Sequence, residues 1–518
     1  MSALSDDSHD PGWTEVPWPA EVRRPDDPRE IVRWDAATLS MAIRTRVVSC
    51  TEVMAAYLDQ IDRINPRVNA IVGLRPRDVL LAEAAQKDRL LEAGHYQGWM
   101  HGFPQAVKDL ADVTGMPTSA GFVRPSWGWP DASRDSLFVA RIRAAGAIFI
   151  GKTNTPELGL GSQTYNEVFG VTGNAWDPTR TAGGSSGGAA VAVALRMLPV
   201  ADGSDFMGSL RNPPGWNNVL GLRPSWGRIP DGPGDLALDQ GGVIGPIART
   251  ALDLALLLRT MSGHCAGSPP SLTDDPAELT GFGLRPDLRG RRVAWLGDLG
   301  GYLPMEDDVR RVTTTALAHF EELGMSVTAL DGLPVTDGFA GNADLWPTWL
   351  TYRHWLAGMS IKTVYDLGLE HHLKPEAVYE YQGLAGGVDG GPISAIDIHR
   401  NAAKRGALYE AFRDLFTTVD YVVLPTAQVM PFDATVTWPR HVAGVEMSSY
   451  HRWMEVTTIG TLINSPTLAL PAGFAHGLPI GLQVIGPHRG EVSVLELGQA
   501  WTARTGLTEQ LPPMLVAS

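Results

Sequence analysis

Apolar residues recur along the first part of the chain with the period of a helix. Between residues 53 and 64 they lie three to four positions apart, after the cap candidates Ser49 and Thr51. This spacing predicts an amphipathic helix, which we expect to end at Pro66 because proline cannot continue a helical hydrogen-bond ladder. A second apolar group at residues 39–43 predicts a shorter helix just before it.

Short apolar runs alternate with helical segments farther along. Apolar runs that predict buried strands occupy residues 147–150, 423–425, 468–471 and 481–485. Helical patterns occupy residues 138–145, ended by Gly146, and the small-residue segment 189–195. The alternation of strand and helix predicts an α/β fold whose sheet carries helices on both faces.

The chain divides into three regions by composition. Residues 1–34 are rich in proline near the start and are expected to form an N-terminal arm, followed by one large domain at 35–518. Residues 262–420 are interpreted as a variable region within that domain, because glycine, proline and aspartate are frequent there and periodicity is weak. Within it, residues 292–330 predict a strand and helix pair.

Charge and cysteine content narrow the partners and the compartment. The net charge of −15 disfavours nucleic acid and anionic membranes as partners. Two cysteines, Cys50 and Cys265, give no disulfide framework, which favours a reducing compartment. There is neither a signal-peptide pattern nor a run of about 18 apolar residues. We therefore expect a cytoplasmic protein, and a homodimer is left open.

The segment from Gly146 to Thr153 matches the P-loop expression G-x-x-x-x-G-K-[ST] but not its structural context. A P-loop follows a strand and opens a helix, whereas here a predicted helix precedes and the intervening residues form an apolar, strand-like run. Pro156 would also interrupt a following helix. Nucleotide binding is not expected.

Three other segments carry residues suited to nucleophilic catalysis. GGSSGG at 183–188 leads into a helix, GSDFMGSLRNP at 203–213 places Ser209 on a glycine-flanked turn, and Lys108 ends a strand-like run. Taken singly, they fit a flexible linker, a capping serine and a lysine that extends its ammonium group to solvent. A serine hydroxyl needs a neighbouring base, and a buried lysine can act as one when neutral.

Together the segments resemble one family, the amidase-signature hydrolases. The resemblance covers roughly residues 35–260 and 415–490, and the motifs that carry it are VKD at 107–109, GKTNTPELG at 151–159, GGSSGG, GSDFMGSLRNP, GLRPSWGRIP at 221–230 and LPAGFAHGLPIGLQVIG at 470–486. It implies one large fold with a mixed central β-sheet. Within the family, the chain resembles bacterial amidases of the 6-aminohexanoate cyclic-dimer hydrolase type.

The resemblance also implies roles for individual residues. Ser209 would be the nucleophile, Ser185 a relay that holds a cis peptide bond, and Lys108 the base. The oxyanion would be bound by the backbone N–H groups of Phe206, Met207, Gly208 and Ser209. Gly159 and Met207 would contact substrate, and Asp205 and Arg211 would support the loop.

The sequence departs from the family pattern at Met207, where a glycine is common. With Phe206, this residue predicts a preference for apolar or aromatic substrates. Neither a cofactor nor a metal is expected, because Glu370, His371 and His372 lack metal-ligand spacing.

The expected activity is hydrolysis of a carboxamide, anilide or carbamate C–N bond with water through an acyl-enzyme. Two alternatives remain. One is the amidase subunit of a glutamine-dependent amidotransferase, and the other is a non-catalytic binding protein on the same scaffold.

Overall fold

The protein is described by a computed structural model that covers residues 16–123, 130–232, 240–283, 285–386 and 391–516. At its centre lies a mixed sheet of eight strands in the order β10-β9-β13-β17-β16-β7-β8-β6. Its strands are β6 (Ala201–Asp205), β7 (Leu220–Arg223), β8 (Val243–Ala248), β9 (Arg292–Trp295), β10 (Ser326–Ala329), β13 (Tyr421–Pro425), β16 (Thr467–Ala475) and β17 (Leu478–Ile485). The pairs β10–β9 and β9–β13 are parallel and the others are antiparallel.

Helices cover both faces of the sheet, as the sequence predicts. Leu468 of β16 is in register with Val484 of β17, and it lies against Gly498 of helix α14 (Glu491–Thr505). Side chains alternate along a strand, so Gly481 of β17 faces the other way. There it packs against helix α6 (Asn212–Asn217).

A smaller sheet of three strands lies beside the central one. Its strands, in the order β1-β3-β2, are β1 (Ile71–Val72), β3 (Ile148–Thr153) and β2 (Pro104–Lys108). The P-loop-like segment is therefore mostly strand β3. Lys152 of that strand donates from Nζ to the carbonyl of Ala111 at 2.6 Å and to Thr118 Oγ1 at 3.0 Å. Two-stranded pairs elsewhere are β4 (Tyr165–Asn166) with β5 (Gly170–Val171), β11 (Val335–Thr336) with β12 (Phe339–Ala340), and β14 (His441–Val442) with β15 (Val445–Glu446).

The predicted helices are present, with one error at an end. Helix α2 (Cys50–Val68) begins with a capping box between Ser49 and Glu52, but it does not end at Pro66. Pro66 lies in the last turn, where it removes one helical bond only, and the helix ends at Asn69 in the left-handed region. The other N-terminal helices are α1 (Ala36–Arg44), α3 (Arg77–Glu92), α4 (Leu137–Ala144), α5 (Gly187–Ala194) and α7 (Ala251–Met261).

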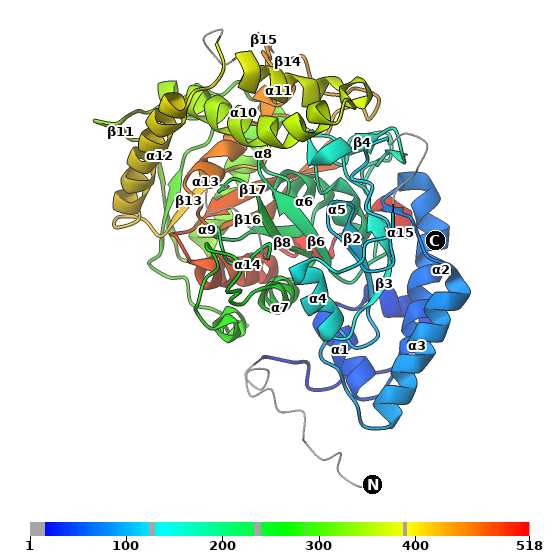
Figure 1. Cartoon of the computed structure of the whole chain (residues 1–518). Helices are drawn as coiled ribbons and strands as arrows, with labels where there is room; N and C mark the ends of the chain where they lie inside the picture. Colours follow the sequence, from blue (N-terminus) through cyan, green and yellow to red (C-terminus); the bar gives the residue numbers. More distant parts are fainter. Residues whose placement is uncertain (1–15, 124–129, 233–239, 284, 387–390, 517–518) are drawn as a thin grey trace.

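Residues 262–420 contain more regular structure than their composition indicated. The strands β9 and β10 of this region belong to the central sheet and are joined through α8 (Asp307–Ala316) and α9 (Ala318–Glu322). Three long helices, α10 (Asn342–Asp366), α11 (Pro375–Gly386) and α12 (Ala395–Leu415), lie together at the top of Figure 1. The remaining helices are α13 (Thr458–Leu462) and α15 (Pro513–Val516).

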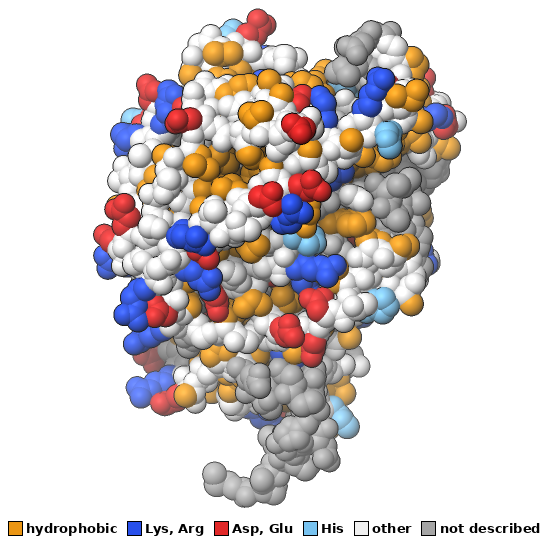
Figure 2. Space-filling view, turned by 90° about the vertical axis from the view of Figure 1, so that its left-hand side faces the viewer, with side chains coloured by type: hydrophobic (Ala, Val, Ile, Leu, Met, Phe, Trp, Pro, Cys, Tyr) orange, Lys and Arg blue, Asp and Glu red, His pale blue; other side chains and the backbone are white. Residues whose placement is uncertain are grey.

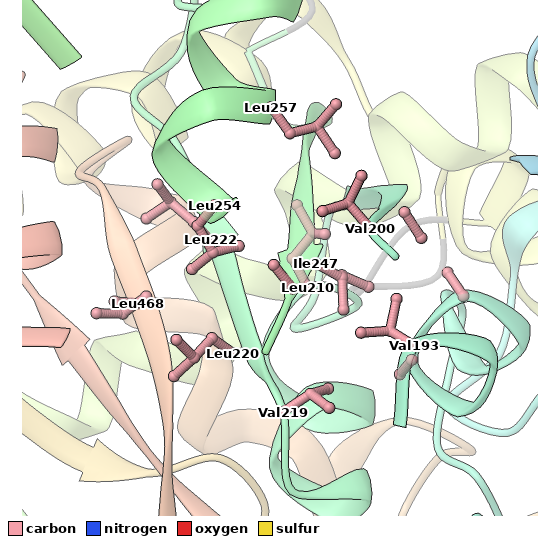
Figure 3. Packing of buried hydrophobic residues seen from close by; sticks show 14 of the residues in the cluster. Val193, Val200, Leu210, Val219, Leu220, Leu222, Ile247, Leu254, Leu257 and Leu468 are labelled. Atoms are coloured by element: carbon pink, nitrogen blue, oxygen red, sulfur yellow. The ribbon is translucent and has the colours of Figure 1, made fainter. Parts of the chain in front are cut away.

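The core fills the space between the central sheet and helices α5 and α7 (Figure 3). Its side chains come from β7, β8, β16, both helices and the segments that connect them. Those labelled are Val193, Val200, Leu210, Val219, Leu220, Leu222, Ile247, Leu254, Leu257 and Leu468. Full burial of such a side chain contributes about 1.5–3 kcal/mol, so this layer holds helix α5 firmly against the sheet. Helix α5 begins two residues after Ser185, and its position fixes that serine.

The ends of the chain and the surface add two observations. Within the expected N-terminal arm, Pro28–Arg33 form a 3-10 helix in which Ile31 and Val32 are buried, while residues 1–15 lie outside the described part. Figure 2 shows one face of the molecule, where acidic and basic side chains are interspersed rather than separated by sign. No helix in the described ranges combines the length and apolar character needed to cross a bilayer.

Candidate active site

The loop that carries Ser209 is shaped by one buried carboxylate. Asp205, the last residue of β6, accepts hydrogen bonds from the backbone N–H groups of Gly208 at 2.9 Å and Leu210 at 3.0 Å. Arg211 donates to both oxygens of Asp205, from Nε and from Nη2, each at 2.9 Å. Burial alone would raise the pKa of Asp205, but the cations Arg211 and Arg223 hold it well below its usual value. The carboxylate thus stays ionised, and its hydrogen bonds to the backbone hold the turn that carries Ser209.

The loop before helix α5 is fixed by contacts that only glycine permits. Gly183 has a φ of +78°, and a Cβ there would lie 2.3 Å from Oδ1 of Asn212. A Cβ on Gly184 would lie 2.9 Å from the backbone N of Gln163. The peptide bond between Gly184 and Ser185 is cis. The GGSSGG segment is therefore a closely packed buried loop and not a flexible linker.

Lys108 ends strand β2 and points into the buried space between these two loops. Its Nζ donates to three hydroxyl groups: Ser185 Oγ at 2.7 Å, Ser186 Oγ at 2.9 Å and Ser204 Oγ at 2.9 Å. The hydroxyl of Ser185 in turn donates to Ser209 Oγ at 3.0 Å. A continuous hydrogen-bond chain therefore runs from Lys108 through Ser185 to Ser209, the three residues that the sequence singled out.

The environment of Lys108 favours its neutral form. Its side chain is buried, with 2% of the residue exposed, and it makes no ion pair within the described part of the chain. Burial lowers the pKa of Lys108 to about 7, against the opposing effect of the carboxylates of Asp202 and Asp205. At neutral pH a substantial fraction of this amine is therefore available to accept a proton.

The four backbone amides expected to bind an oxyanion are not equivalent. The Gly208 N–H already donates to Asp205, so it is directed away from the space above Ser209. The N–H groups of Phe206, Met207 and Ser209 have no hydrogen-bond partner among the described residues. The geometry thus leaves three of the four amides available, and the Gly208 amide is instead part of the turn.

A cavity of about 350 Å³ opens beside Ser209. Gly159 and Met207, the two expected substrate contacts, both line it, as do Ser185 and Phe206. Most of the other walls are apolar, and the lining includes Leu110, Leu158, Leu160, Leu356, Ala357, Ile361, Val364 and Met454. Such a cavity is suited to an apolar ligand whose orientation is fixed by a few polar groups.

Sequence reasoning missed several residues of this site. Ser186 and Ser204 both accept from Lys108, although the only available signal was their position beside Ser185 and Asp205 in the two motifs. The far wall of the cavity comes from α10 and from residues 450–454, and it includes the buried guanidinium of Arg353. No motif marked that arginine.

Other candidate groups lie elsewhere or have a structural role. Trp216, just after the nucleophile loop, is fully buried and stacks on Trp453 with ring centroids 5.5 Å apart. Glu370–His372 form a short 3-10 helix. Within the described residues, no three His, Cys, Asp or Glu side chains are grouped so that they could hold a metal ion.

Comparison with known proteins identifies the family. Residues 52–495 match the family model described as Amidase. The chain belongs to the amidase-signature family, and it is an enzyme that hydrolyses amide C–N bonds.

Individual relatives extend this result. An acylamidase of Rhodococcus erythropolis is 33% identical over 478 residues, which is 90% of this chain and 94% of that protein. A glutamyl-tRNA(Gln) amidotransferase subunit of Thermosynechococcus vestitus is 32% identical, over 90% of this chain and 97% of that one. Among solved structures, a bacterial aryl acylamidase of the amidase-signature family has a TM-score of 0.82 and 25% identity, covering 92% of this chain and 97% of its own. The 6-aminohexanoate cyclic dimer hydrolase shares the fold, with a TM-score of 0.76 at 23% identity over 93% of this chain and 99% of its own.

Proposed function

We propose that the enzyme cleaves its amide through an acyl-enzyme on Ser209, with Ser185 as the proton relay and Lys108 as the base. The observation that carries this proposal is the hydrogen-bond chain from Lys108 Nζ to Ser185 Oγ at 2.7 Å and on to Ser209 Oγ at 3.0 Å. These distances allow a proton to move between neighbouring groups without rearrangement of the backbone.

The hydrogen bonds around Lys108 support Ser185 as the relay. A neutral amine has two N–H donors and one lone pair, so it can donate to two of its three hydroxyl neighbours and accept from the third. The Ser186 hydroxyl donates to the carbonyl of Ser204 at 3.2 Å, so it can only accept from the lysine. Ser185 contacts both Lys108 and Ser209. When its hydroxyl turns to donate to the lone pair of the neutral amine, its oxygen accepts from the hydroxyl of Ser209, and a proton can then pass from Ser209 to Lys108.

The reaction then proceeds in two balanced halves. Ser209 Oγ attacks the carbonyl carbon while its proton passes to Ser185, whose own proton passes to the neutral amine of Lys108. When the tetrahedral intermediate collapses, the C–N bond breaks and the protons return by the same path to the departing amine. Water then attacks the ester carbonyl on Ser209 while its proton passes through Ser185 to Lys108. The bond between Ser209 Oγ and the acyl carbon breaks, the proton returns by the relay to Ser209 Oγ, and the carboxylic acid leaves.

The remaining residues of the turn support these steps. The free amides of Phe206, Met207 and Ser209 stabilise the negative oxygen of the intermediate, a contribution of about 3–4 kcal/mol for one such donor. Asp205 and Arg211 act on the loop and not on the substrate, since each is fully buried and bonded to the other.

We further propose that the substrates are amides with apolar or aromatic groups, including anilides. The support is the apolar lining of the 350 Å³ cavity, together with similarity to an acylamidase and to an aryl acylamidase. Each buried methylene of the substrate contributes about 0.8 kcal/mol. Carbamates and activated esters present the same carbonyl to Ser209, and they are the next compounds to test.

A second candidate function is favoured by the similarity to glutamyl-tRNA(Gln) amidotransferase subunits, namely release of ammonia from glutamine for a partner protein. The cavity does not fit free glutamine well, because that substrate carries both an ammonium and a carboxylate group. The cation in the cavity wall, Arg353, is already paired with Glu380 at 2.6 Å. Ammonia release from glutamine, measured with and without candidate partner proteins, distinguishes the two functions. A binding protein without catalysis is disfavoured by the complete hydrogen-bond chain.

The decisive experiment is labelling of Ser209. A serine-directed fluorophosphonate should add one mass increment to the wild type and none to Ser209→Ala, by intact-mass spectrometry. Ser262→Ala, which removes another buried serine, is the matched control and should label like the wild type. An adduct that persists in Ser209→Ala would show that the nucleophile is a different residue.

A further inference from the structure

The far wall of the cavity contains a buried polar group that the proposed mechanism does not use. Arg353 lies on α10, is 4% exposed, and lines the same cavity as Ser209. Its guanidinium carbon lies 5.3 Å from the centre of the Phe206 ring, so the arginine packs against a residue of the loop that carries Ser209.

Two of the three nitrogen atoms of this guanidinium are bonded to protein groups. Nε donates to Glu380 Oε1 at 2.6 Å, and Nη2 donates to the hydroxyl of Tyr450 at 2.5 Å. Tyr450 itself donates to Glu380 Oε1, and the second oxygen of Glu380 is bonded to His354 Nδ1 at 2.9 Å. The third nitrogen, Nη1, has no partner among the described residues.

A second unpartnered atom lies in the same wall. His451 also lines the cavity, and its Nε2 is buried without a hydrogen bond in the described structure, while its Nδ1 is bonded to Ser449 at 3.1 Å. An unmet hydrogen bond on a buried polar group costs about 1–3 kcal/mol, and somewhat more when the group is charged. A ligand that satisfies His451 Nε2 therefore gains affinity over one that leaves it unmet, and the unpartnered Arg353 Nη1 offers a further hydrogen bond in the same wall.

The charge of the wall determines which ligand chemistry fits. Arg353 is neutralised by Glu380, which is fully buried beside it. Burial lowers the pKa of His451 well below its usual value, so this side chain is uncharged near neutral pH. The wall thus offers the N–H donor of Arg353 without a net positive charge, and a carboxylate would lose its hydration there with no free counter-ion.

We propose that Arg353 is a specificity-determining residue whose Nη1–H group binds an uncharged hydrogen-bond acceptor, such as a ketone, ether or nitro oxygen, at the end of the substrate remote from the scissile amide. This inference rests on the proposed amidase reaction at Ser209 and names its substrate class more closely. The substrate is an amide with an apolar body and one neutral polar tip. A site built to hydrogen-bond such a group discriminates against an analogue that lacks it.

The test compares matched substrates. Anilides that carry a para-acetylmethyl group are compared with anilides that carry a para-isobutyl group of the same shape. In one series the group is on an aromatic ring of the acyl part, and in the other it is on the aromatic ring of the amine part. The methylene keeps the electronic effect of the ketone away from the amide. In the wild type, kcat/KM should be about tenfold or more higher for the ketone in at least one series, corresponding to one hydrogen bond to a charged donor. A carboxymethyl analogue should not share the gain.

Variants assign the preference to the arginine. Arg353→Met alone leaves Glu380 buried without its partner, so the double variant Arg353→Met, Glu380→Gln is the main test and Arg353→Lys is the second. In the double variant the ketone preference should fall below about twofold, while hydrolysis of the isobutyl substrate persists. Arg452→Met, the same change at a nearby arginine outside the cavity, should keep the wild-type preference.

The outcomes separate this inference from the proposed reaction. A wild type that hydrolyses both members of each pair equally overturns the role of Arg353 but leaves the reaction at Ser209 intact. An unchanged ketone preference in the double variant, or in Arg353→Lys when the double variant does not fold, also overturns it. Absence of hydrolysis of every amide, together with no labelling of Ser209, refutes the proposed reaction itself.

Discussion

The proposed role of Lys108 predicts a specific dependence of activity on pH. Only the neutral amine can accept the proton of Ser209, and burial lowers the pKa of Lys108 to about 7. About one-tenth of the lysine is then neutral at pH 6, half at pH 7 and about nine-tenths at pH 8. An unshifted lysine would be neutral in only about one molecule in three thousand at pH 7. We therefore expect kcat/KM to rise about fivefold between pH 6 and pH 7, about twofold between pH 7 and pH 8, and to level off above pH 8.

The neighbouring carboxylate of Asp202 provides a way to move this profile. Asp202 raises the pKa of Lys108, and it also accepts the backbone N–H of Lys108 at 3.1 Å. Asp202→Asn keeps an acceptor for that N–H but removes the negative charge. The neutral form of Lys108 then becomes easier to reach, so the rising limb should shift to lower pH.

The assay is kcat/KM for one anilide substrate from pH 5.5 to 9, measured for the wild type, Asp202→Asn and a control variant under identical ionic strength. The matched control is Asp253→Asn, another buried carboxylate, which caps helix α1 through the N–H groups of Ala36 and Ala37. The Asp253→Asn variant should leave the rising limb of the pH profile of kcat/KM at the same pH as in the wild type. A flat profile between pH 5.5 and 7, or a limb that moves to higher pH in Asp202→Asn, would show that Lys108 is not the titrating base.

Three further predictions test other parts of the site. Lys108→Ala should abolish amide cleavage but spare part of the cleavage of a nitrophenyl ester, because a phenolate leaves without a proton. Amide turnover within about tenfold of the wild type, which corresponds to an increase of roughly 1.4 kcal/mol in the activation barrier, would exclude the lysine as the base. Across acetamide, butyramide and hexanamide, kcat/KM should rise, and Met207→Gly should flatten this series while hydrolysis continues; an unchanged series would place the side chain away from the substrate. Arg211→Met removes the closer of the two cations that pair with the buried Asp205 and leaves Arg223, at 3.5 Å, as the other. It should lower the free energy of unfolding by about 3–5 kcal/mol, read as a reduced denaturation midpoint in urea, and a change below about 1 kcal/mol would contradict the support role.

The parts of the fold that sequence reasoning located are those in which one local pattern decides the structure. The helix after Ser49 has both a cap and a regular apolar face, and strands β13, β16 and β17 each contain a short apolar run in a buried sheet. Lys108 was noticeable because a charged residue ends such a run. The long motifs then singled out Ser185 and Ser209, which lie in the hydrogen-bond chain with Lys108.

Helix α10 escaped detection because its buried face mixes apolar with polar and charged residues. Thr348, Arg353 and His354 are buried in it, whereas Met359 is half exposed, so the usual contrast between an apolar and a polar face is lost. The bonds of Arg353 to Glu380 and Tyr450 come from distant segments and leave no local signal. The engagement of the Gly208 amide by Asp205 was equally invisible, since a sequence motif does not reveal which way a backbone N–H points.

The site therefore combines two parts with different origins in the chain. Lys108, Ser185 and Ser209 all precede residue 210 and are held by the sheets and by helix α5, whereas the far wall of the cavity comes from α10 and residues 450–454. The wall can change without disturbing the hydrogen-bond chain, because its contact with the nucleophile loop is made chiefly through the Phe206 ring, against Trp349, Tyr352 and Arg353. This separation directs the search for the substrate of this enzyme to the residues of α10.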